Sequence, residues 1–208
     1  MIEETLRTEF EALKNDFETI RQQIESDVVR TELYEGEFYE LTPYSYQRNG
    51  FRQGKPVKRP DTVKSIKNLC IYGFNNQNQI VEVKVGCSIE NQFYHTFLYY
   101  TDNFVKSILY NNGKRLINVR HYFFEGGKLK RLQSCGSRGS REENYIYNEN
   151  ALTHIEIKQY DIDGKNGGDL IHRFQYQDDG SLETITQSFP NGYSEIIYKT
   201  KKRLLTNR

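Results

Sequence analysis

The stretch HRFQYQDDGSLETI, residues 172–185, has a related copy earlier in the chain. Residues 95–108, HTFLYYTDNFVKSI, align with it without a gap and share its first His, a Phe, a Tyr, an Asp and the terminal Ile. In residues 172–177 aromatic and polar residues alternate, and the turn-forming residues DDGS follow. Alternation followed by such a turn is the pattern of a strand that enters a tight hairpin. The stretch therefore predicts a β-hairpin that is repeated along the chain.

Weaker copies of the same unit extend from about residue 70 to near the C-terminus. In each copy an apolar residue recurs, and in all but the last copy another apolar residue follows three positions later. The first set is Ile80, Val105, Leu129, Leu152, Leu182 and Leu204, and the second is Val83, Ile108, Leu132, Ile155 and Ile185. A unit of about 24 residues is the size of one hairpin with its connection, and stacked hairpins bury faces that single ones expose. We therefore predict a mainly β fold, an antiparallel meander of about six stacked hairpin repeats with roughly ten to twelve strands.

The N-terminal segment has a helical period instead. Apolar residues recur there at alternating spacings of four and three, and polar residues fill the other positions; they are Leu6, Phe10, Leu13, Phe17, Ile20 and Ile24. This pattern predicts one amphipathic α-helix over roughly residues 3–28, about 39 Å long. We expect its apolar stripe to pack on the sheet. A homodimer formed through this helix as a short coiled coil is the alternative.

The chain fits one structural domain with three parts. Residues 1–30 form the N-terminal helix on the sheet, residues 31–69 hold early strands and a basic linker, and residues 70–208 form the hairpin-repeat sheet. The linker, YQRNGFRQGKPVKRPD at 46–61, contains five cations that could contact nucleic acid: Arg48, Arg52, Lys55, Lys58 and Arg59. A solvated linker is the favoured interpretation, and the basic residues 199–208 are interpreted as a solvated tail.

Composition limits the classes of function. The net charge is +1, which argues against a field that attracts nucleic acid to the whole protein. The cysteines, Cys70, Cys87 and Cys135, are odd in number and lack the spacing of metal ligands, so we expect reduced thiols in the cytoplasm and neither disulfides nor a metal. No apolar leader and no run of 18 apolar residues is present, so we expect no membrane span.

The stretch CGSRGSR, residues 135–141, places a Cys and an Arg six positions apart, as cysteine phosphatases do. A phosphate-binding loop needs the N–H groups of a helix N-terminus, whereas this loop is expected to connect a strand ending near Ser134 to one beginning near Asn144. The flanking residues also differ, because Ser134, Arg138 and Glu142 stand where that family has His, Gly, and Ser or Thr. We interpret the stretch as a hairpin loop, and an enzyme that uses Cys135 is the less favoured alternative.

The four histidines do not predict a catalytic or metal site. His95 and His172 share a position in the repeat, but three units separate them, which is about six strands or roughly 29 Å. His121 and His154 lie beside aromatic residues, where a hydrogen-bonded structural histidine is expected. The Asp-rich stretch DIDGKNGGD, residues 161–169, lacks the Glu that a calcium loop needs and is interpreted as a turn. We therefore predict no metal and no cofactor.

Two stretches resemble known hairpin-repeat families. YQDDGSLETI, residues 176–185, is similar to the YD (RHS-type) repeat, with Gln177 in place of its Asp. LYNNGKRLINVRHYFFEGGKLKRL, residues 109–132, resembles the MORN-like repeats of bacterial antitoxin and immunity proteins, and YEGEF at 34–38 is similar to a MORN opening. The resemblance implies a small cytoplasmic immunity protein that binds and neutralises a partner toxin.

A wide sheet with aromatic residues at every second position suits recognition of another protein. We therefore predict a non-enzymatic protein-binding protein, and the resemblance makes the partner a toxin. The candidate partner-binding residues are Tyr72, Phe97, Tyr99, Phe174 and Tyr176. A general scaffold is the main alternative, and nucleic-acid binding or an enzyme is less favoured.

Overall fold

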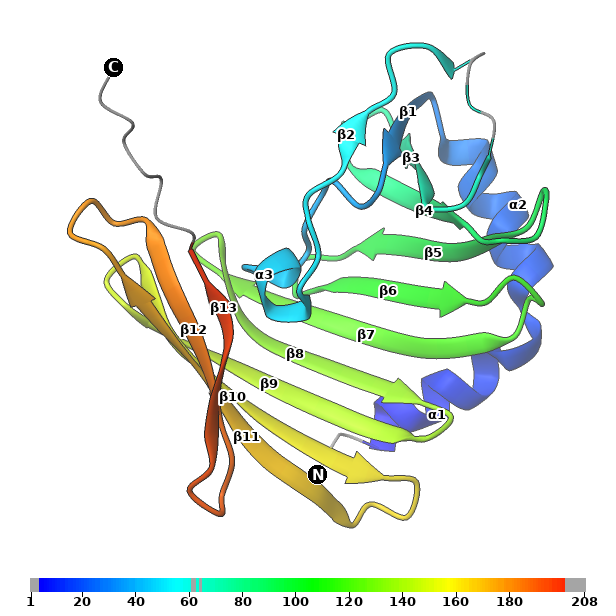
Figure 1. Cartoon of the computed structure of the whole chain (residues 1–208). Helices are drawn as coiled ribbons and strands as arrows, with labels where there is room; N and C mark the ends of the chain where they lie inside the picture. Colours follow the sequence, from blue (N-terminus) through cyan, green and yellow to red (C-terminus); the bar gives the residue numbers. More distant parts are fainter. Residues whose placement is uncertain (1–3, 61–62, 64, 201–208) are drawn as a thin grey trace, which may run out of the picture.

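The computed structural model describes residues 4–60, 63 and 65–200. Within them thirteen strands form one antiparallel sheet in the linear order β13-β12-β11-β10-β9-β8-β7-β6-β5-β4-β3-β1-β2 (Figure 1). The first strands are β1 (Arg30–Glu35), β2 (Lys55–Pro56), β3 (Leu69–Phe74), β4 (Ile80–Gly86), β5 (Phe93–Tyr100), β6 (Val105–Tyr110) and β7 (Leu116–Glu125). The others are β8 (Lys128–Gly136), β9 (Gly139–Asn148), β10 (Ala151–Asp161), β11 (Asn166–Tyr176), β12 (Leu182–Ser188) and β13 (Ser194–Lys199). The mainly β meander is confirmed.

The repeated part of the sequence corresponds to β3–β13, which is eleven strands and falls within the expected range. Each strand of this part pairs with the next along the chain. The segment 31–69 extends the sheet further, because β1 pairs with β3 from Arg30 opposite Phe74 to Glu35 opposite Leu69, and β2 pairs with β1. Leu204 and most of the basic C-terminal segment lie outside the described residues.

β-Bulges explain why two apolar residues recur three positions apart. In a regular strand such residues point to opposite faces. In β4, β8, β10 and β12, however, one extra residue interrupts the pairing between them; these residues are Val81, Lys130, Thr153 and Glu183. The extra residue returns both apolar side chains to the same face. In β6 the pairing is regular, and Val105 and Ile108 accordingly belong to different core clusters.

The turns between strands reuse one hydrogen-bonding device. Asn111 Oδ1 accepts from the backbone N–H groups of Gly113 and Arg115, both at 2.9 Å. Asp161 Oδ1 accepts in the same way from Asp163 and Lys165, which confirms that the Asp-rich stretch is a turn. Such side chains close a hairpin by replacing backbone acceptors.

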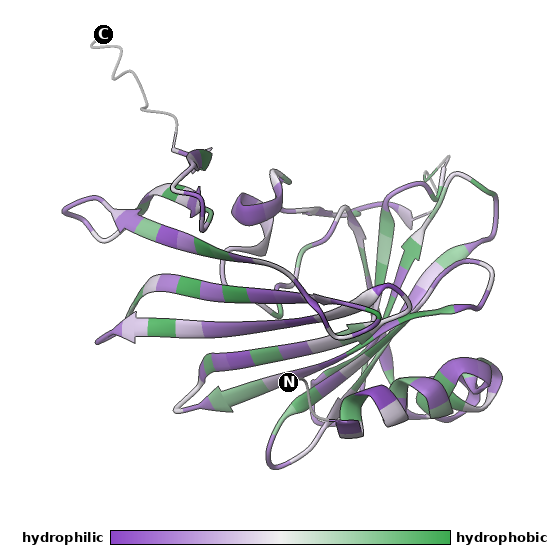
Figure 2. Cartoon of the chain, turned by 90° about the horizontal axis from the view of Figure 1, so that it is seen from below, coloured by the Kyte–Doolittle hydropathy of each residue, from purple (hydrophilic) through white to green (hydrophobic). Residues whose placement is uncertain are grey.

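The N-terminal segment packs on the outer, convex side of the bent sheet (Figures 1 and 2). It is not one helix as predicted, because α1 (Glu4–Ala12) and α2 (Phe17–Asp27) are separated by a 3-10 turn at Leu13–Asn15. The side chains of Asn and Asp compete for backbone groups and disfavour a helix interior, and Asn15 and Asp16 lie at this break. The carbonyl of Leu13 accepts from the backbone N–H of Asp16 at 3.3 Å and from the hydroxyl of Tyr110 at 2.6 Å, so Tyr110 attaches the break to the sheet.

The apolar stripe of these helices lies in the protein's own core. Leu6, Phe10, Phe17, Ile20 and Ile24 are at most 6% exposed, in one cluster with residues of β4–β8. The predicted alternative, a homodimer through this stripe, is therefore wrong, because the sheet already covers the side chains that would form the seam. None of the described helices is long and apolar enough to cross a membrane.

Residues 36–54 cross the inner, concave side of the sheet, and we call this segment the strap (Figures 1 and 2). The strap contains the short helix α3 (Ser45–Asn49), which contacts β13. In its first part Phe38 stacks on Tyr34 of β1, and further along Leu41 and Tyr44 pack on the cluster of β7–β12. The prediction of a solvated linker from residue 46 is thus wrong for the strap's end, where Tyr46 is 6% exposed.

Replacing Tyr110 tests the attachment of the helical break. In Tyr110→Phe the carbonyl of Leu13 loses its shorter hydrogen bond and keeps only the N–H of Asp16 at 3.3 Å, so the free energy of unfolding should fall by about 1 kcal/mol. Urea denaturation measures this change, with Tyr193→Phe, at an exposed position, as the control. Equal stability of the two variants would mean that the hydrogen bond does not hold the break.

Candidate functional site on the concave face of the sheet

Of the five aromatic residues predicted to bind a partner, three are buried in the core and two are partly buried against it. Tyr72, Phe97 and Phe174 are 2%, 0% and 7% exposed. Tyr99 packs against the cluster beneath the helices, and Tyr176 packs in the concave cluster, where its hydroxyl donates to the carbonyl of Leu152. The prediction is corrected because the helices and the strap cover the faces to which these rings point.

Cys135 lies at the end of β8 in a two-residue hairpin to β9, which begins at Gly139 rather than near Asn144. The loop therefore connects two strands, as predicted. The Cys135 side chain is fully buried beneath α1, and burial raises the pKa of its thiol. A buried thiol with a raised pKa is a poor nucleophile.

The four histidines lie apart, as predicted for His95 and His172, which stand on β5 and β11. His95 contacts Phe17 beneath α2, and His121 bonds Glu9 of α1 at 2.8 Å. His154 Nδ1 lies 3.0 Å from the hydroxyl of Thr153. The described residues contain no group of three His, Cys, Asp or Glu side chains that could hold a metal ion.

The strap is tied to the sheet by a buried ion pair that sequence reasoning missed. Arg48 Nη2 donates to Glu143 Oε2 at 2.9 Å, and both side chains are 7% exposed. Arg141 Nε donates to the other oxygen of Glu143 at 2.7 Å, and the hydroxyl of Tyr145 donates to Oε2 at 2.6 Å. Burial alone would raise the pKa of Glu143, but the charges of Arg48 and Arg141 outweigh it and lower this pKa. Glu143 is therefore an ionised carboxylate held by two arginines.

His172 extends this network to the edge of the sheet. Its Nδ1 accepts from Arg48 Nε at 3.1 Å, so its Nε2 carries the proton and donates to Gln187 Oε1 at 2.9 Å. Burial and the neighbouring charge of Arg48 lower the pKa of His172 to about 4. The imidazole is neutral at pH 7, as its acceptor role toward Arg48 requires.

Five polar side chains form a row across this face of the sheet. Ser107 pairs with Arg120, Arg120 with Ser134, Ser134 with Arg141, and Arg141 with Gln159. These residues lie side by side on β6–β10 and are half-buried, except Ser107, which is buried. Their separation along the sequence is large, and only the strand register brings them together. Two arginines of this region, Arg48 and Arg141, bind Glu143, and Arg120 lies further along the row.

Two hollows flank the row. One, of about 510 Å³, lies between the strap and β3–β7 and includes Ser107, Arg120 and Tyr122. The other, of about 480 Å³, lies at the β8–β9 hairpin and includes Ser134, Arg138, Arg141 and Gln159. Asn118 also lines the second hollow, and its buried Oδ1 has no hydrogen-bond partner in the described structure. We take this row with its hollows as the candidate functional site.

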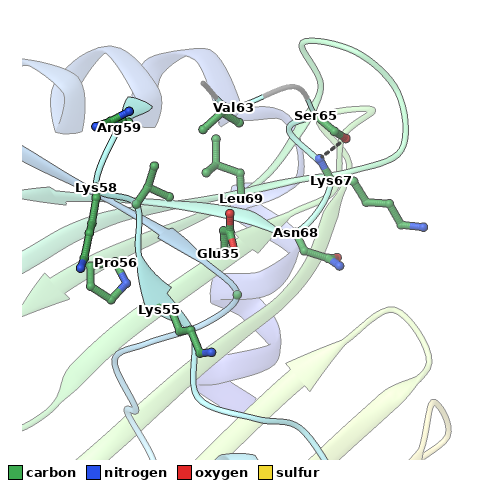
Figure 3. Close-up of a pocket in the computed structure, with 12 residues that line it drawn as sticks. Glu35, Lys55, Pro56, Lys58, Arg59, Val63, Ser65, Lys67, Asn68 and Leu69 are labelled. Atoms are coloured by element: carbon green, nitrogen blue, oxygen red, sulfur yellow. Dashed lines mark hydrogen bonds between the residues drawn. The ribbon is translucent and has the colours of Figure 1, made fainter. Parts of the chain in front are cut away.

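A larger hollow of about 1100 Å³ at the β2 edge contains Lys55, Lys58 and Arg59 of the predicted basic cluster (Figure 3). Lys55, Lys58 and Lys67 line it, but their side chains end at separate places around its rim. Val63 and Leu69 lie together at its centre. An anion site needs cations that converge, so the concave row is the stronger candidate.

Comparison with models of known protein families, with curated proteins and with solved structures found no match. The function is therefore argued from the site itself and from the resemblance of the repeats.

Replacing Arg48 tests the tie between strap and sheet. Arg48→Met removes one partner of a buried pair, so the free energy of unfolding should fall by about 3–5 kcal/mol. Arg52→Met, an exposed position in the same segment, should change it by less than about 0.5 kcal/mol. Chemical denaturation compares the two, and similar losses would contradict a role for the ion pair.

Lowering the pH tests the neutral state of His172. In the unfolded chain His172 becomes protonated near its ordinary pKa of 6.5, whereas in the folded chain its pKa is about 4. The free energy of unfolding is therefore highest above pH 6.5 and falls as the pH is lowered toward 4. Between pH 7 and 5 His172 should account for roughly 2 kcal/mol of lost stability. His172→Gln should show a correspondingly smaller loss in denaturation experiments at the two pH values, and an unchanged pH dependence would contradict the assignment.

Proposed function

We propose that this chain is a non-enzymatic protein that binds one partner protein, and that the partner is a toxin which it neutralises. The observation that supports a binding surface is the hollow at the β8–β9 hairpin, which the strap does not line. The repeat resemblance to antitoxin and immunity proteins supports the choice of a toxin. We place the action in the cytoplasm, where Cys70, Cys87 and Cys135 would stay reduced.

The chemistry of the hollow favours an acidic partner surface. Arg138 is exposed at the hairpin tip, and Arg141 uses its Nε for Glu143. Ser134, Ser140 and Gln159 add neutral hydrogen-bonding groups beside these cations. Because the strands hold the groups in a fixed register, few side chains need to be ordered when a partner binds. Complementary charge speeds association and excludes wrong partners.

The structure weighs against the enzyme alternative based on Cys135. That thiol is fully buried and its pKa is raised, so it would have to move from beneath α1 to attack a substrate. A general scaffold is a second candidate, because a hollow of this kind could bind several acidic proteins. The two candidates differ in whether a single partner is bound and whether cells are protected.

A charge reversal in the hollow tests the proposal. The tagged chain is expressed at native level in its own host, bound proteins are identified by mass spectrometry, and each is produced alone and together with this chain. We expect one partner protein to be recovered at a ratio near one-to-one. This partner should arrest growth when it is expressed alone but not when it is expressed together with this chain. Arg138→Glu should weaken the complex at least about tenfold, since it replaces attraction by like-charge repulsion.

Arg173→Glu is the matched control, because Arg173 is exposed on β11 and outside both hollows. It should bind and protect like the unmodified chain. Several partners without protection would favour the scaffold and contradict the toxin. A single toxin that Arg138→Glu still binds at full affinity would refute the hollow as the contact surface.

A further inference from the structure

The hollow under the strap differs from its neighbour in being lined mostly by apolar side chains. Its floor is formed by β3–β7, with Val83, Val85, Leu98 and Leu109 on one side of the strands. Tyr39, Leu41 and Thr42 of the strap line it from the other side. Its volume of about 510 Å³ is within the range of small-molecule sites, which are mostly apolar with a few polar groups.

One cation lies in this apolar setting without a carboxylate partner. No carboxylate oxygen of the described residues is within 4.0 Å of the Arg120 guanidinium. Its nearest acidic neighbour in the network, Glu143, is bound to Arg48, Arg141 and Tyr145. Burial opposes the charge of Arg120, but interactions with Tyr122 and the more distant Glu143 keep its pKa raised. The group is charged and has N–H donors to offer.

The acidic side chains on the wall formed by the strap limit the negative charge that a ligand of this hollow can carry. Glu37 and Glu40 line the hollow from the strap. The carboxylate of Glu40 is held in place by the hydroxyl of Ser45 at 2.8 Å and the N–H of Tyr46 at 3.0 Å. Two acidic side chains disfavour a doubly charged phosphate, whereas a single carboxylate can bind Arg120 at the far wall.

We propose that this hollow binds a small organic acid with an apolar body and one carboxylate. The carboxylate accepts from the guanidinium of Arg120, which suits carboxylates because its N–H groups form a planar fork. Ser107 lines the same end of the hollow and can donate its hydroxyl. The apolar body contacts Val83, Leu98 and Leu109. This site goes beyond partner binding, since it does not use Arg138 or Arg141.

A titration of the protein alone with matched probes tests the site. The probes are 4-phenylbutanoate, its uncharged analogue 4-phenylbutanamide, and phenyl phosphate, followed by methyl NMR signals of Val83, Leu98 and Leu109. We expect saturable shifts with the acid and binding at least about tenfold weaker with the amide, the size of effect of one charge-assisted hydrogen bond. Phenyl phosphate should bind more weakly than the acid.

Two variants of the site and one control variant separate loss of the site from loss of the fold. Arg120→Gln should weaken binding of the acid at least about tenfold without changing that of the amide. Leu109→Phe fills the hollow and should weaken both probes while Arg120 stays in place, and Arg173→Gln on β11 should change neither. Circular dichroism confirms that each variant is folded.

Three results would overturn the proposal: no saturable shift up to about 10 mM acid, equal affinity for acid and amide, or tighter binding of phenyl phosphate. None of them depends on whether a toxin is found. A failure to capture a partner protein would not change the expected result of the probe titration, so the two proposals are tested independently.

Discussion

The ion pair between Arg48 and Glu143 is the constraint on which the concave face depends. The sheet bends around the strap, and apolar clusters on the inner side are covered by Phe38, Leu41 and Tyr44. Those contacts are not directional, and a shift of the strap along the strands would replace one apolar contact by another. A buried arginine with three hydrogen-bonding partners admits one position only. The pair therefore fixes where the strap lies.

The same pair divides the concave face. Where the strap crosses, the side chains of β9–β12 are in the core. The row from Ser107 to Gln159 begins in the hollow under the strap, which contains Ser107 and Arg120, and ends in the hollow at the β8–β9 hairpin. One hollow therefore lies under the strap, and the other lies at the hairpin, where none of its lining residues belongs to the strap. One is roofed and apolar with a single cation, and the other is open and polar. The position of one segment thus produces two sites of different character on one sheet.

The repeats and the amphipathic N-terminus could be predicted because their signals are local. Alternation within a strand and an Asn or Asp at a turn can be recognised from a few neighbouring residues. The apolar stripe of a helix can be recognised from two turns of the helix. The bulges could not be predicted from the spacing alone, although they are the reason why two apolar residues recur three positions apart in most copies of the repeat. The aromatic positions were predicted correctly as one face of each strand, but not that a helix or the strap would cover that face.

The candidate site was beyond sequence reasoning for a different reason. The members of the row show no common spacing, and only the register of five strands places them side by side; they are Ser107, Arg120, Ser134, Arg141 and Gln159. Arg48 was assigned to a solvated linker because its neighbours in the sequence are polar, whereas its partner is 95 residues away. Long-range pairs of this kind leave no periodic pattern.

The linear strand order has a consequence for how such a sheet could grow. From β3 onward each strand pairs with the next strand along the chain, so a duplicated hairpin can be added at the β13 edge without re-pairing the others. The helices contact β4–β8, and the strap is anchored on β9 and β11, so both would keep their places. The sheet can therefore change in width during evolution while its core attachments and the two hollows are preserved.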